Sequence, residues 1–140
     1  MDDAELAELL HLVTRRLRHG YARRLEPLGL NPGQARALRA LAVEGEPLRM
    51  VRLAERLRIV PRSVTPVVDA LEAAGLVRRE VDPANRRSTL VRLTDAGGET
   101  LERAREARRQ AAQELFAVLS PGQRDRLEGL LRTVASQFDD

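Results

Sequence analysis

Cysteine is absent from the 140 residues of this chain, and the absence excludes several classes of protein. A disulfide framework, a thiolate metal site, a cysteine nucleophile and a cysteine-based redox switch all require the missing thiol. No apolar run approaches the roughly 18 residues that a membrane-spanning helix needs, and the acidic start at residues 2–8 is unlike a signal peptide. We therefore expect a cytoplasmic protein with no membrane partner.

Enzyme motifs are missing as well. The sequence has no pair of histidines at metal-ligand spacing, no glycine-rich phosphate loop and no nucleophile elbow. It therefore predicts no catalytic residues, no metal site and no cofactor, and we do not expect an enzyme. A chain of 140 residues fits a single domain, 1–140, which buries about two thirds of its unfolded surface and needs no cross-link to fold.

Lysine is absent too, so all 24 basic residues are arginine, against 21 acidic residues. The charge is unevenly distributed. Residues 49–94 hold 10 arginines and 5 acidic residues, a surplus of +5, whereas the rest of the chain holds 14 arginines and 16 acidic residues. The basic footprint is therefore the middle of the chain, which is the pattern expected of a protein that binds nucleic acid.

Apolar spacing predicts helices on both sides of this basic segment. A three-four pattern over residues 6–21 predicts a first helix. Residues 31–34 (NPGQ) and 120–123 (SPGQ) each place an N-cap, a proline at N1 and a glutamine at N3 ahead of an apolar run. The first of these motifs predicts a second helix and the other a last helix that reaches the C-terminus. A long helix rich in arginine and glutamate is expected within residues 94–119.

The basic middle of the chain predicts two short helices and a hairpin. The helices are expected at 50–57 and 62–74, joined by the connection 58–61, and a proline-led turn then separates two alternating runs. This order is typical of a winged helix-turn-helix, whose second helix fits the major groove of DNA, about 12 Å wide. Arg86 and Arg87 on the hairpin tip would reach the adjoining minor groove, whose negative potential attracts arginine.

The start of the second short helix carries the candidate base contacts. Arg62 is expected to bind a guanine edge or a phosphate, and the hydroxyls of Ser63 and Thr65 to add hydrogen bonds. Pro66 lies among them and removes a helical hydrogen bond to Arg62 if the helix begins at Pro61 or Arg62. We expect the helix to begin at Pro61 or Arg62, with a distorted first turn. In the alternative, Ser63 is the N-cap.

A structural interpretation exists for each of these residues. Arg86 and Arg87 could be solvated turn residues, and the candidates on the helix could be capping and surface groups. Asp82, which precedes Pro83, is interpreted as a structural turn residue, because an acid repels phosphate.

Residues 52–97, RLAERLRIVPRSVTPVVDALEAAGLVRREVDPANRRSTLVRLTDAG, resemble the DNA-binding core of the multiple antibiotic resistance regulator (MarR) family. The similar motifs are LAxxL, VTxxVDxLExxGLV and a DPxDRR wing that leads into LT; GLNPGQARALRAL at 29–41 is also similar. The resemblance implies a mainly α protein with a small β-hairpin wing. Its winged helix-turn-helix core would span 30–97, with dimerisation helices in 1–29 and 98–140.

The resemblance also implies a function. Family members are homodimeric transcription factors, and a small, frequently phenolic, ligand often lowers their affinity for double-stranded DNA. We expect a repressor that binds a pseudo-palindromic operator. A pocket for a phenolic or anionic ligand would lie between the core and the dimer helices, where His11, Arg15 or Arg39 could meet it. The chain departs from the family at Asn85, usually aspartate, and at Pro66, commonly a polar residue.

Two other functions stay open at this point. The winged helix could be a protein-interaction module that uses the hairpin as its contact surface, although the surplus charge of residues 49–94 counts against it. The protein could also package DNA without regard to sequence.

Overall fold

The structure, a computed structural model, describes residues 1–139 and is mainly helical, as the sequence predicts. Within these residues, six α-helices, one short 3-10 helix and three strands follow in the order α1 (Asp3–Leu25), η1 (Glu26–Leu28), α2 (Pro32–Glu44), β1 (Leu48–Arg49), α3 (Met50–Leu57), α4 (Pro61–Ala73), β2 (Val77–Asp82), β3 (Asn85–Leu93), α5 (Asp95–Phe116) and α6 (Pro121–Ser136).

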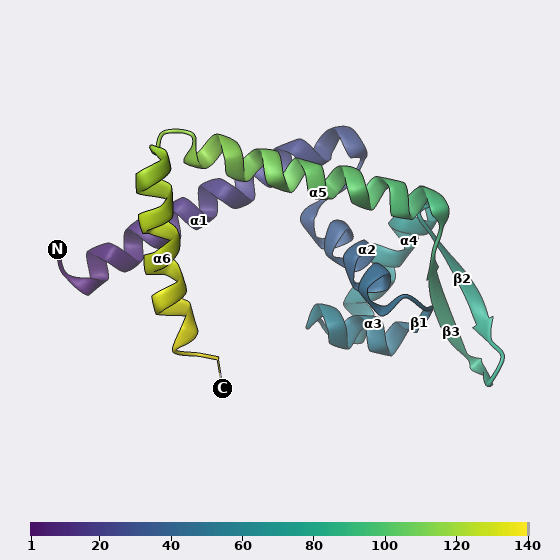
Figure 1. The fold of residues 1–140 in the computed structure, drawn as a ribbon. Coiled ribbons are helices and arrows are strands. Elements are labelled where there is room, and N and C mark those ends of the chain that lie inside the picture. Colours follow the sequence, from purple (N-terminus) through teal and green to yellow (C-terminus); the bar gives the residue numbers. More distant parts are fainter. Residues whose placement is uncertain (140) are drawn as a thin grey trace.

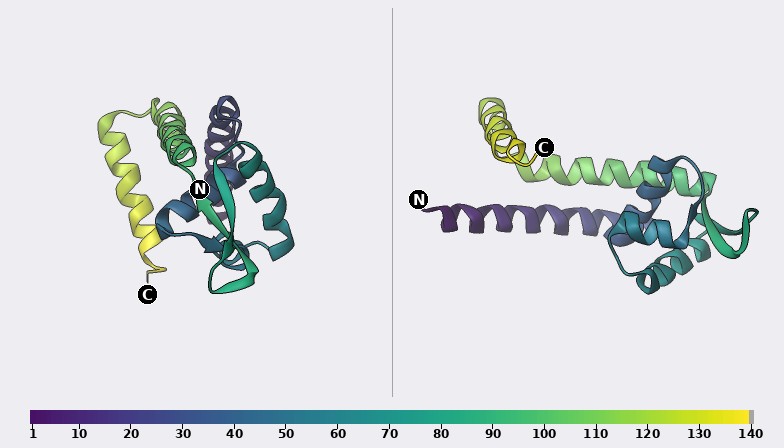
Figure 2. Two further views of the ribbon diagram at one scale, coloured as in Figure 1. Left: turned by 90° about the vertical axis from the view of Figure 1, so that its right-hand side faces the viewer. Right: turned by 90° about the horizontal axis from the view of Figure 1, so that it is seen from below.

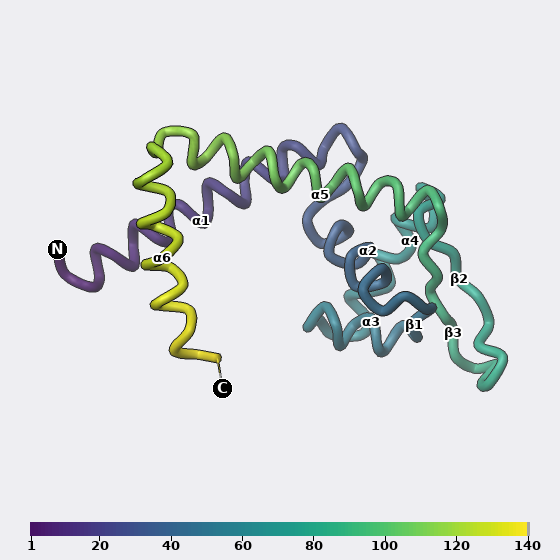
Figure 3. The backbone as a smooth tube through the Cα atoms, viewed as in Figure 1, coloured from purple at the N-terminus to yellow at the C-terminus, as the bar shows by residue number. Residues whose placement is uncertain are grey.

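The molecule has a globular end and an extended end (Figure 1). Helices α2, α3 and α4 form the globular end with the three strands, and the β2–β3 hairpin projects beyond them as a wing. Helices α1 and α5 lie side by side and run from this body to the extended end, where the chain turns and α6 leaves at a steep angle on the side of α5 away from α1 (Figures 1 and 2). Both termini lie at the end opposite the wing (Figure 3).

The predicted N-terminal caps of α2 and α6 are confirmed. The Asn31 side chain accepts a hydrogen bond from the Gln34 backbone N–H at 2.8 Å, and the Gln34 side chain accepts one from the Asn31 N–H at 3.0 Å. Ser120 and Gln123 form the same reciprocal pair. Each pair satisfies two backbone donors that a helix start leaves without partners, which explains why both helices begin at the following proline.

The prediction that the last helix reaches the C-terminus is wrong. Helix α6 ends at Ser136, and the Phe138 and Asp139 N–H groups bond to carbonyls three residues earlier. The Ser136 hydroxyl donates to the Thr133 carbonyl at 3.0 Å, but no glycine follows to close the helix and no residue of this end is buried, so the final turn tightens. Phe138 therefore lies beyond the helix, although it continues the apolar seam of α6.

The sheet contains a strand that the sequence did not predict. Its antiparallel order is β1-β3-β2, and Leu48 pairs with Val91 while Arg49 pairs with Leu90. Strand β1 has only two residues, too few for an alternating pattern to be visible. It connects the start of α3 to the wing, so the wing is joined to the body of the core by backbone hydrogen bonds.

The hydrophobic core lies between α2, α3, α4, the sheet and the first half of α5. Its largest fully buried side chains are those of Leu25, Leu38, Leu53, Val64, Val68, Leu71 and Val91. By contrast, no residue of α6 is buried, and the apolar residues of the first half of α1 are exposed. The core therefore holds α3, α4 and the wing in shape, whereas the extended end leaves apolar surface uncovered.

Replacement of Gly97 by alanine is expected to destabilise the protein. A Cβ at this position would lie 2.1 Å from the Leu76 carbonyl oxygen, because the start of α5 packs directly on the backbone that follows α4. The strain should cost about 1–3 kcal/mol of the free energy of unfolding, measured by urea denaturation.

Gly98 provides the matched control. It is the next residue of the same helix, and a Cβ there meets nothing within 4 Å. Gly98→Ala should leave stability unchanged or raise it by up to about 1 kcal/mol, because alanine is the better helix former. Equal effects of the two substitutions on stability would show that the close approach at Gly97 does not explain the loss in Gly97→Ala.

Candidate nucleic-acid interface

Helices α3 and α4 form a helix-turn-helix with a short, well-bonded turn. Arg58 ends α3 in the left-handed conformation, with φ of 55°, and the Ile59 N–H bonds to the Ala54 carbonyl at 3.1 Å. Val60 is the N-cap of α4, and the Ser63 N–H bonds to its carbonyl at 2.9 Å. The expected start at Pro61 is therefore confirmed, and Ser63 is not the N-cap. Pro66 lies inside the helix.

The predicted base contacts lie on the solvent face of α4. Val64, Val68 and Leu71 are buried on the opposite face and fix the rotation of the helix against the core. The exposed side chains of its first two turns include all four candidates, Arg62, Ser63, Thr65 and Pro66. The structure therefore brings these four together at the N-terminal half of one exposed helix.

The C-terminal half of α4 differs in charge. Arg79 of β2 bonds to the Asp69 carboxylate at 2.5 Å and to the Glu72 carboxylate at 2.8 Å. The Arg79 backbone N–H also donates to Glu72, and this bond, followed by that of the guanidinium, lowers the pKa of Glu72. The C-terminal half of α4 therefore carries two carboxylates bound by Arg79, whereas the unpaired arginine of this helix, Arg62, lies at its N-terminal half.

The wing presents Arg86 and Arg87 at the start of β3, next to the turn. Both side chains are exposed, and no carboxylate within residues 1–139 lies within ion-pair distance of either. The Asn85 side chain accepts a hydrogen bond from the Arg87 backbone N–H at 3.1 Å. Asn85 thus offers the wing a neutral hydrogen bond where an aspartate could form an ion pair. Both guanidinium groups are left without a carboxylate partner in the described residues.

Asp82 holds the base of the wing, in the structural role that the sequence predicted. Its side chain is only 8% exposed, and its Oδ2 accepts hydrogen bonds from the Arg49 Nε and Nη2 atoms, each at 2.8 Å. Its Oδ1 accepts one from the Ala84 N–H at 2.9 Å. The Ala84 bond, and after it the Arg49 guanidinium, lowers the pKa of Asp82. The carboxylate therefore connects the wing turn to β1.

Acid should loosen the wing through Asp82. Since its pKa is lowered in the folded state, its stabilising effect is complete above the ordinary aspartate pKa of about 3.9 and is lost as the pH falls through the lowered value. We expect urea denaturation from pH 7 to pH 3 to show a smaller loss of stability for Asp82→Asn than for the natural chain. Identical pH profiles would mean that the carboxylate charge at this position does not stabilise the wing.

The arginines of the core divide into two groups. Six of the ten in residues 49–94 form ion pairs, among them Arg49, Arg79 and Arg92. For the other four, no acidic partner lies within ion-pair distance in the part of the chain that is described; they are Arg58, Arg62, Arg86 and Arg87. The unpaired charge of the core is thus confined to the helix-turn-helix turn, the start of α4 and the wing.

Sequence reasoning missed two arginines of this region, the unpaired Arg58 and the structural Arg49. Arg58 has no motif to reveal it, and only its left-handed conformation and exposure single it out. Arg49 pairs with a residue 33 positions later in the chain, and no local pattern indicates such a partner.

The three candidate ligand residues do not meet within one chain. His11 and Arg15 lie together in a shallow hollow on the surface of α1, beside Glu5 and Glu8. Arg39 is half-buried on α2, and the first half of α1 extends away from that helix (Figures 1 and 2). A site that uses all three would require a second chain.

Within the described residues, no group of three or more histidine, aspartate or glutamate side chains could hold a metal ion. No helix in residues 1–139 is long and apolar enough to cross a membrane.

A helix-turn-helix with an unpaired basic face and a basic hairpin beside it defines a winged helix-turn-helix DNA-binding protein. The family pattern described as MarR matches residues 30–89. Together with the relatives below, the match shows that the chain belongs to the MarR family.

Relatives support this assignment over the whole chain. An HTH-type transcriptional regulator of Mycobacterium leprae is 33% identical over 138 residues, which cover 99% of this chain and 96% of the relative. Among solved structures, MarR of E. coli in its apo form has a TM-score of 0.80 at 28% identity, with 92% of this chain and 95% of that chain covered.

A second E. coli structure is a mutant MarR complexed with operator DNA. It has a TM-score of 0.71 at 27% identity, and the match covers 93% of both chains. By family and fold, the present chain is a DNA-binding transcriptional regulator.

Proposed function

We propose that the protein binds a pseudo-palindromic operator as a homodimer and represses the adjoining gene. The observation that carries this proposal is the separation of the core arginines into paired and unpaired groups. The four unpaired arginines, Arg58, Arg62, Arg86 and Arg87, lie on three exposed segments at one end of the molecule. Together they give this end of the molecule positive charge that no carboxylate of residues 1–139 neutralises, and such a surface attracts the phosphates of a DNA backbone.

Each segment has a distinct role in this arrangement. Helix α4 enters the major groove, where Arg62 binds a guanine edge or a phosphate and Ser63 and Thr65 add hydrogen bonds. The wing places Arg86 and Arg87 at the neighbouring minor groove. Arg58, in the turn before α4, is positioned for a phosphate rather than a base, because it lies outside the helix that enters the groove.

The extended end supplies the dimer interface. Leu6, Leu9 and Leu10 of α1 are 48–58% exposed, and Leu130 and Val134 of α6 are exposed by 62% and 57%. So much uncovered apolar surface on two helices of the same end is unusual for a monomer and typical of an association surface.

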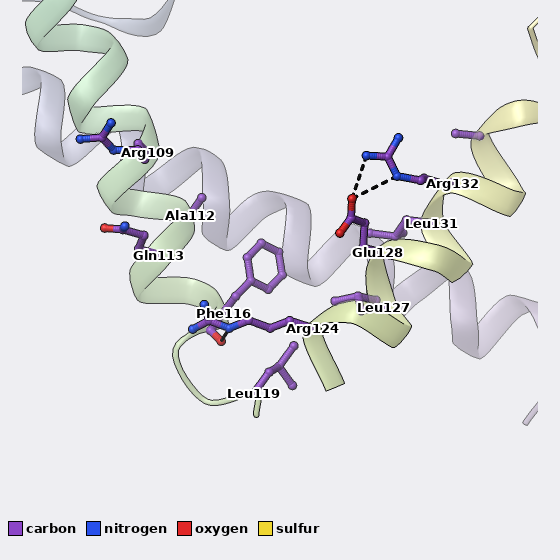
Figure 4. Close-up of a pocket in the computed structure, with 11 residues that line it drawn as sticks. Arg109, Ala112, Gln113, Phe116, Leu119, Arg124, Leu127, Glu128, Leu131 and Arg132 are labelled. Atoms are coloured by element: carbon purple, nitrogen blue, oxygen red, sulfur yellow. Dashed lines mark hydrogen bonds and ion pairs between the residues drawn. The ribbon is translucent and has the colours of Figure 1, made fainter. Parts of the chain in front are cut away.

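A groove between α5 and α6 fits a helix from the second chain (Figure 4). It measures about 530 Å³, and Phe116, Leu127 and Leu131 line it, with Arg124 and Arg132 along its sides. Arg132 already pairs with Glu128, whereas Arg124 forms no ion pair within residues 1–139. The first turn of α1 is acidic and is followed by the exposed leucines, so α1 of a second copy offers apolar side chains for the groove and negative charge for Arg124. We therefore assign the groove to the partner's α1.

Leu131→Glu should dissociate the dimer. The substitution places a charge in the groove, which costs several kcal/mol if the partner helix covers it. Light scattering at micromolar concentration should give twice the chain mass of 15.6 kDa for the natural protein and 15.6 kDa for the variant. Val43→Glu, at an exposed site on the globular end, is the control and should remain dimeric. A natural protein of 15.6 kDa would refute the dimer.

Ligand control is part of the proposal. Dimerisation would place a second chain beside the core, and a pocket between core and dimer helices could then draw on His11, Arg15 and Arg39 from two chains. All three can bind an anion or a phenolate. Release of a bound operator by 4-hydroxybenzoate, and loss of that release in Arg39→Ala, would support this site; release unchanged in Arg39→Ala would remove Arg39 from it.

Footprinting on selected DNA tests the operator directly. Two recognition helices related by a two-fold axis should protect two half-sites about one helical turn apart, and binding should weaken steeply with salt. Where the site overlaps a promoter, the bound dimer would exclude RNA polymerase, which a transcription assay would record as repression. A footprint without two-fold symmetry would contradict the dimeric arrangement.

A further inference from the structure

Pro66 is the unusual residue on the exposed face of α4. It follows Arg62 by one helical turn, so the two side chains lie on the same face, while the buried Val64 and Val68 face the core. Its ring is exposed and is part of no intramolecular apolar cluster. A proline inside a helix forfeits a backbone hydrogen bond, here the one to the Arg62 carbonyl, and destabilises a regular helix.

That cost has no visible compensation within the described chain. Pro66 does not begin the helix, since α4 starts five residues earlier at Pro61, and it does not fill the core. An interaction that the exposed face of α4 makes with another molecule would offset this cost.

The chemistry of proline limits what it can recognise. Its ring has no charge, no hydrogen-bond donor and no acceptor, so it can bind neither a phosphate nor the polar edge of a base. The major groove offers one apolar feature, the C5-methyl group of thymine. A proline ring is also rigid, so contact with this methyl group costs no side-chain entropy.

We propose that Pro66 is a specificity-determining residue that selects thymine by apolar contact with its C5-methyl group, next to the base or phosphate bound by Arg62. The inference rests on the proposed docking of α4 in the major groove. The two residues have complementary roles, because Arg62 supplies a charged, salt-dependent contact and Pro66 adds a contact that depends on sequence and not on salt.

Uracil substitution provides the test, because deoxyuridine differs from thymidine only in lacking the methyl group. The operator is first selected by the natural protein from random duplexes. Each thymine of a half-site is then replaced by deoxyuridine in turn, and the Kd is measured by fluorescence anisotropy at two salt concentrations. We expect one position per half-site at which the loss of the methyl group weakens binding about fourfold, the value for burial of one such group, with the same factor at both salt concentrations.

Three variants show whether Pro66 is the cause. Pro66→Val and Pro66→Ser both restore the backbone N–H, but only valine keeps an apolar surface. The penalty for deoxyuridine should persist in Pro66→Val and vanish in Pro66→Ser. It should also persist in Thr65→Ser, which deletes the one other methyl group among the candidate contacts. Circular dichroism verifies that each variant is folded.

The possible results separate this inference from the proposed function. If the natural protein selects no sequence, both fail. If it selects an operator but no thymine shows a penalty, the assignment of Pro66 is wrong and the proposed function as a regulator still stands. The same conclusion follows if the penalty survives in Pro66→Ser or vanishes in Thr65→Ser. Addition of a methyl group to a cytosine placed at the sensitive position should recover part of the lost affinity; no recovery would also overturn it.

Discussion

Replacement of both Arg86 and Arg87 by alanine is expected to weaken binding to operator and random duplexes together. The two guanidinium groups are exposed, have no acidic partner within residues 1–139 and project on the wing, so their contribution to DNA binding is electrostatic. The slope of log affinity against log salt concentration, the salt slope, should become shallower by about one for each lost contact. A dimer loses two contacts in each chain, so its salt slope should change by about four. Between 50 and 200 mM salt, the natural protein should then lose about 150- to 250-fold more affinity than the variant.

The same hairpin supplies a control of equal charge. Arg78 and Arg92 both pair with Glu80, at 3.1 and 2.8 Å, and do not lie at the tip. Alanine at these two positions changes the net charge by the same amount but should change the salt slope less. Neither pair of substitutions should move the free energy of unfolding by more than about 0.5 kcal/mol per residue. An unchanged slope in the tip variant would make Arg86 and Arg87 plain turn residues.

Arg62→Ala is expected to act on sequence preference. Its side chain lies exposed at the second position of α4, where a recognition helix meets base edges. If it binds a guanine edge, the variant should lose about 1–3 kcal/mol per half-site on the operator, some 5- to 150-fold, with a much smaller loss on random DNA. Binding assays on both duplexes at fixed salt measure the difference.

Arg62→Lys refines the result. Lysine keeps the charge but cannot present two parallel donors to guanine, so this variant should retain binding to random DNA and lose preference for the operator. Equal losses on operator and random DNA in Arg62→Ala would instead assign the guanidinium to a phosphate, the alternative that the sequence left open.

Local patterns predicted the helices of the core well, because each is encoded within a few residues. The capping motif at residues 31–34 and the apolar spacing of α3 and α4 indicated their starts and buried faces without knowledge of the fold. The end of α6 was harder, because no capping residue marks it and its apolar seam continues to Phe138 beyond the helix. Strand β1 was missed because its two residues form a strand only by pairing with β3.

In the candidate site, too, some features follow from the local sequence and others depend on tertiary packing. Exposure of Arg62 and Thr65 follows from helical periodicity, and the position of Arg86 and Arg87 follows from the hairpin. The division of the arginines into paired and unpaired does not follow from local patterns, because the partners of Arg49 and Arg79 are fixed by tertiary packing. Composition predicted the surplus charge of residues 49–94, and only the fold reveals that the surplus gathers at the start of α4 and on the wing.

The ratio of affinities for selected and random duplexes, at one physiological salt concentration, tests the central claim most directly. A sequence-specific regulator should bind its selected pseudo-palindrome at least about a thousandfold more tightly than random DNA. A ratio near one would indicate a protein that packages DNA without regard to sequence, and no binding to either duplex would indicate a protein-interaction module; both results would contradict the account.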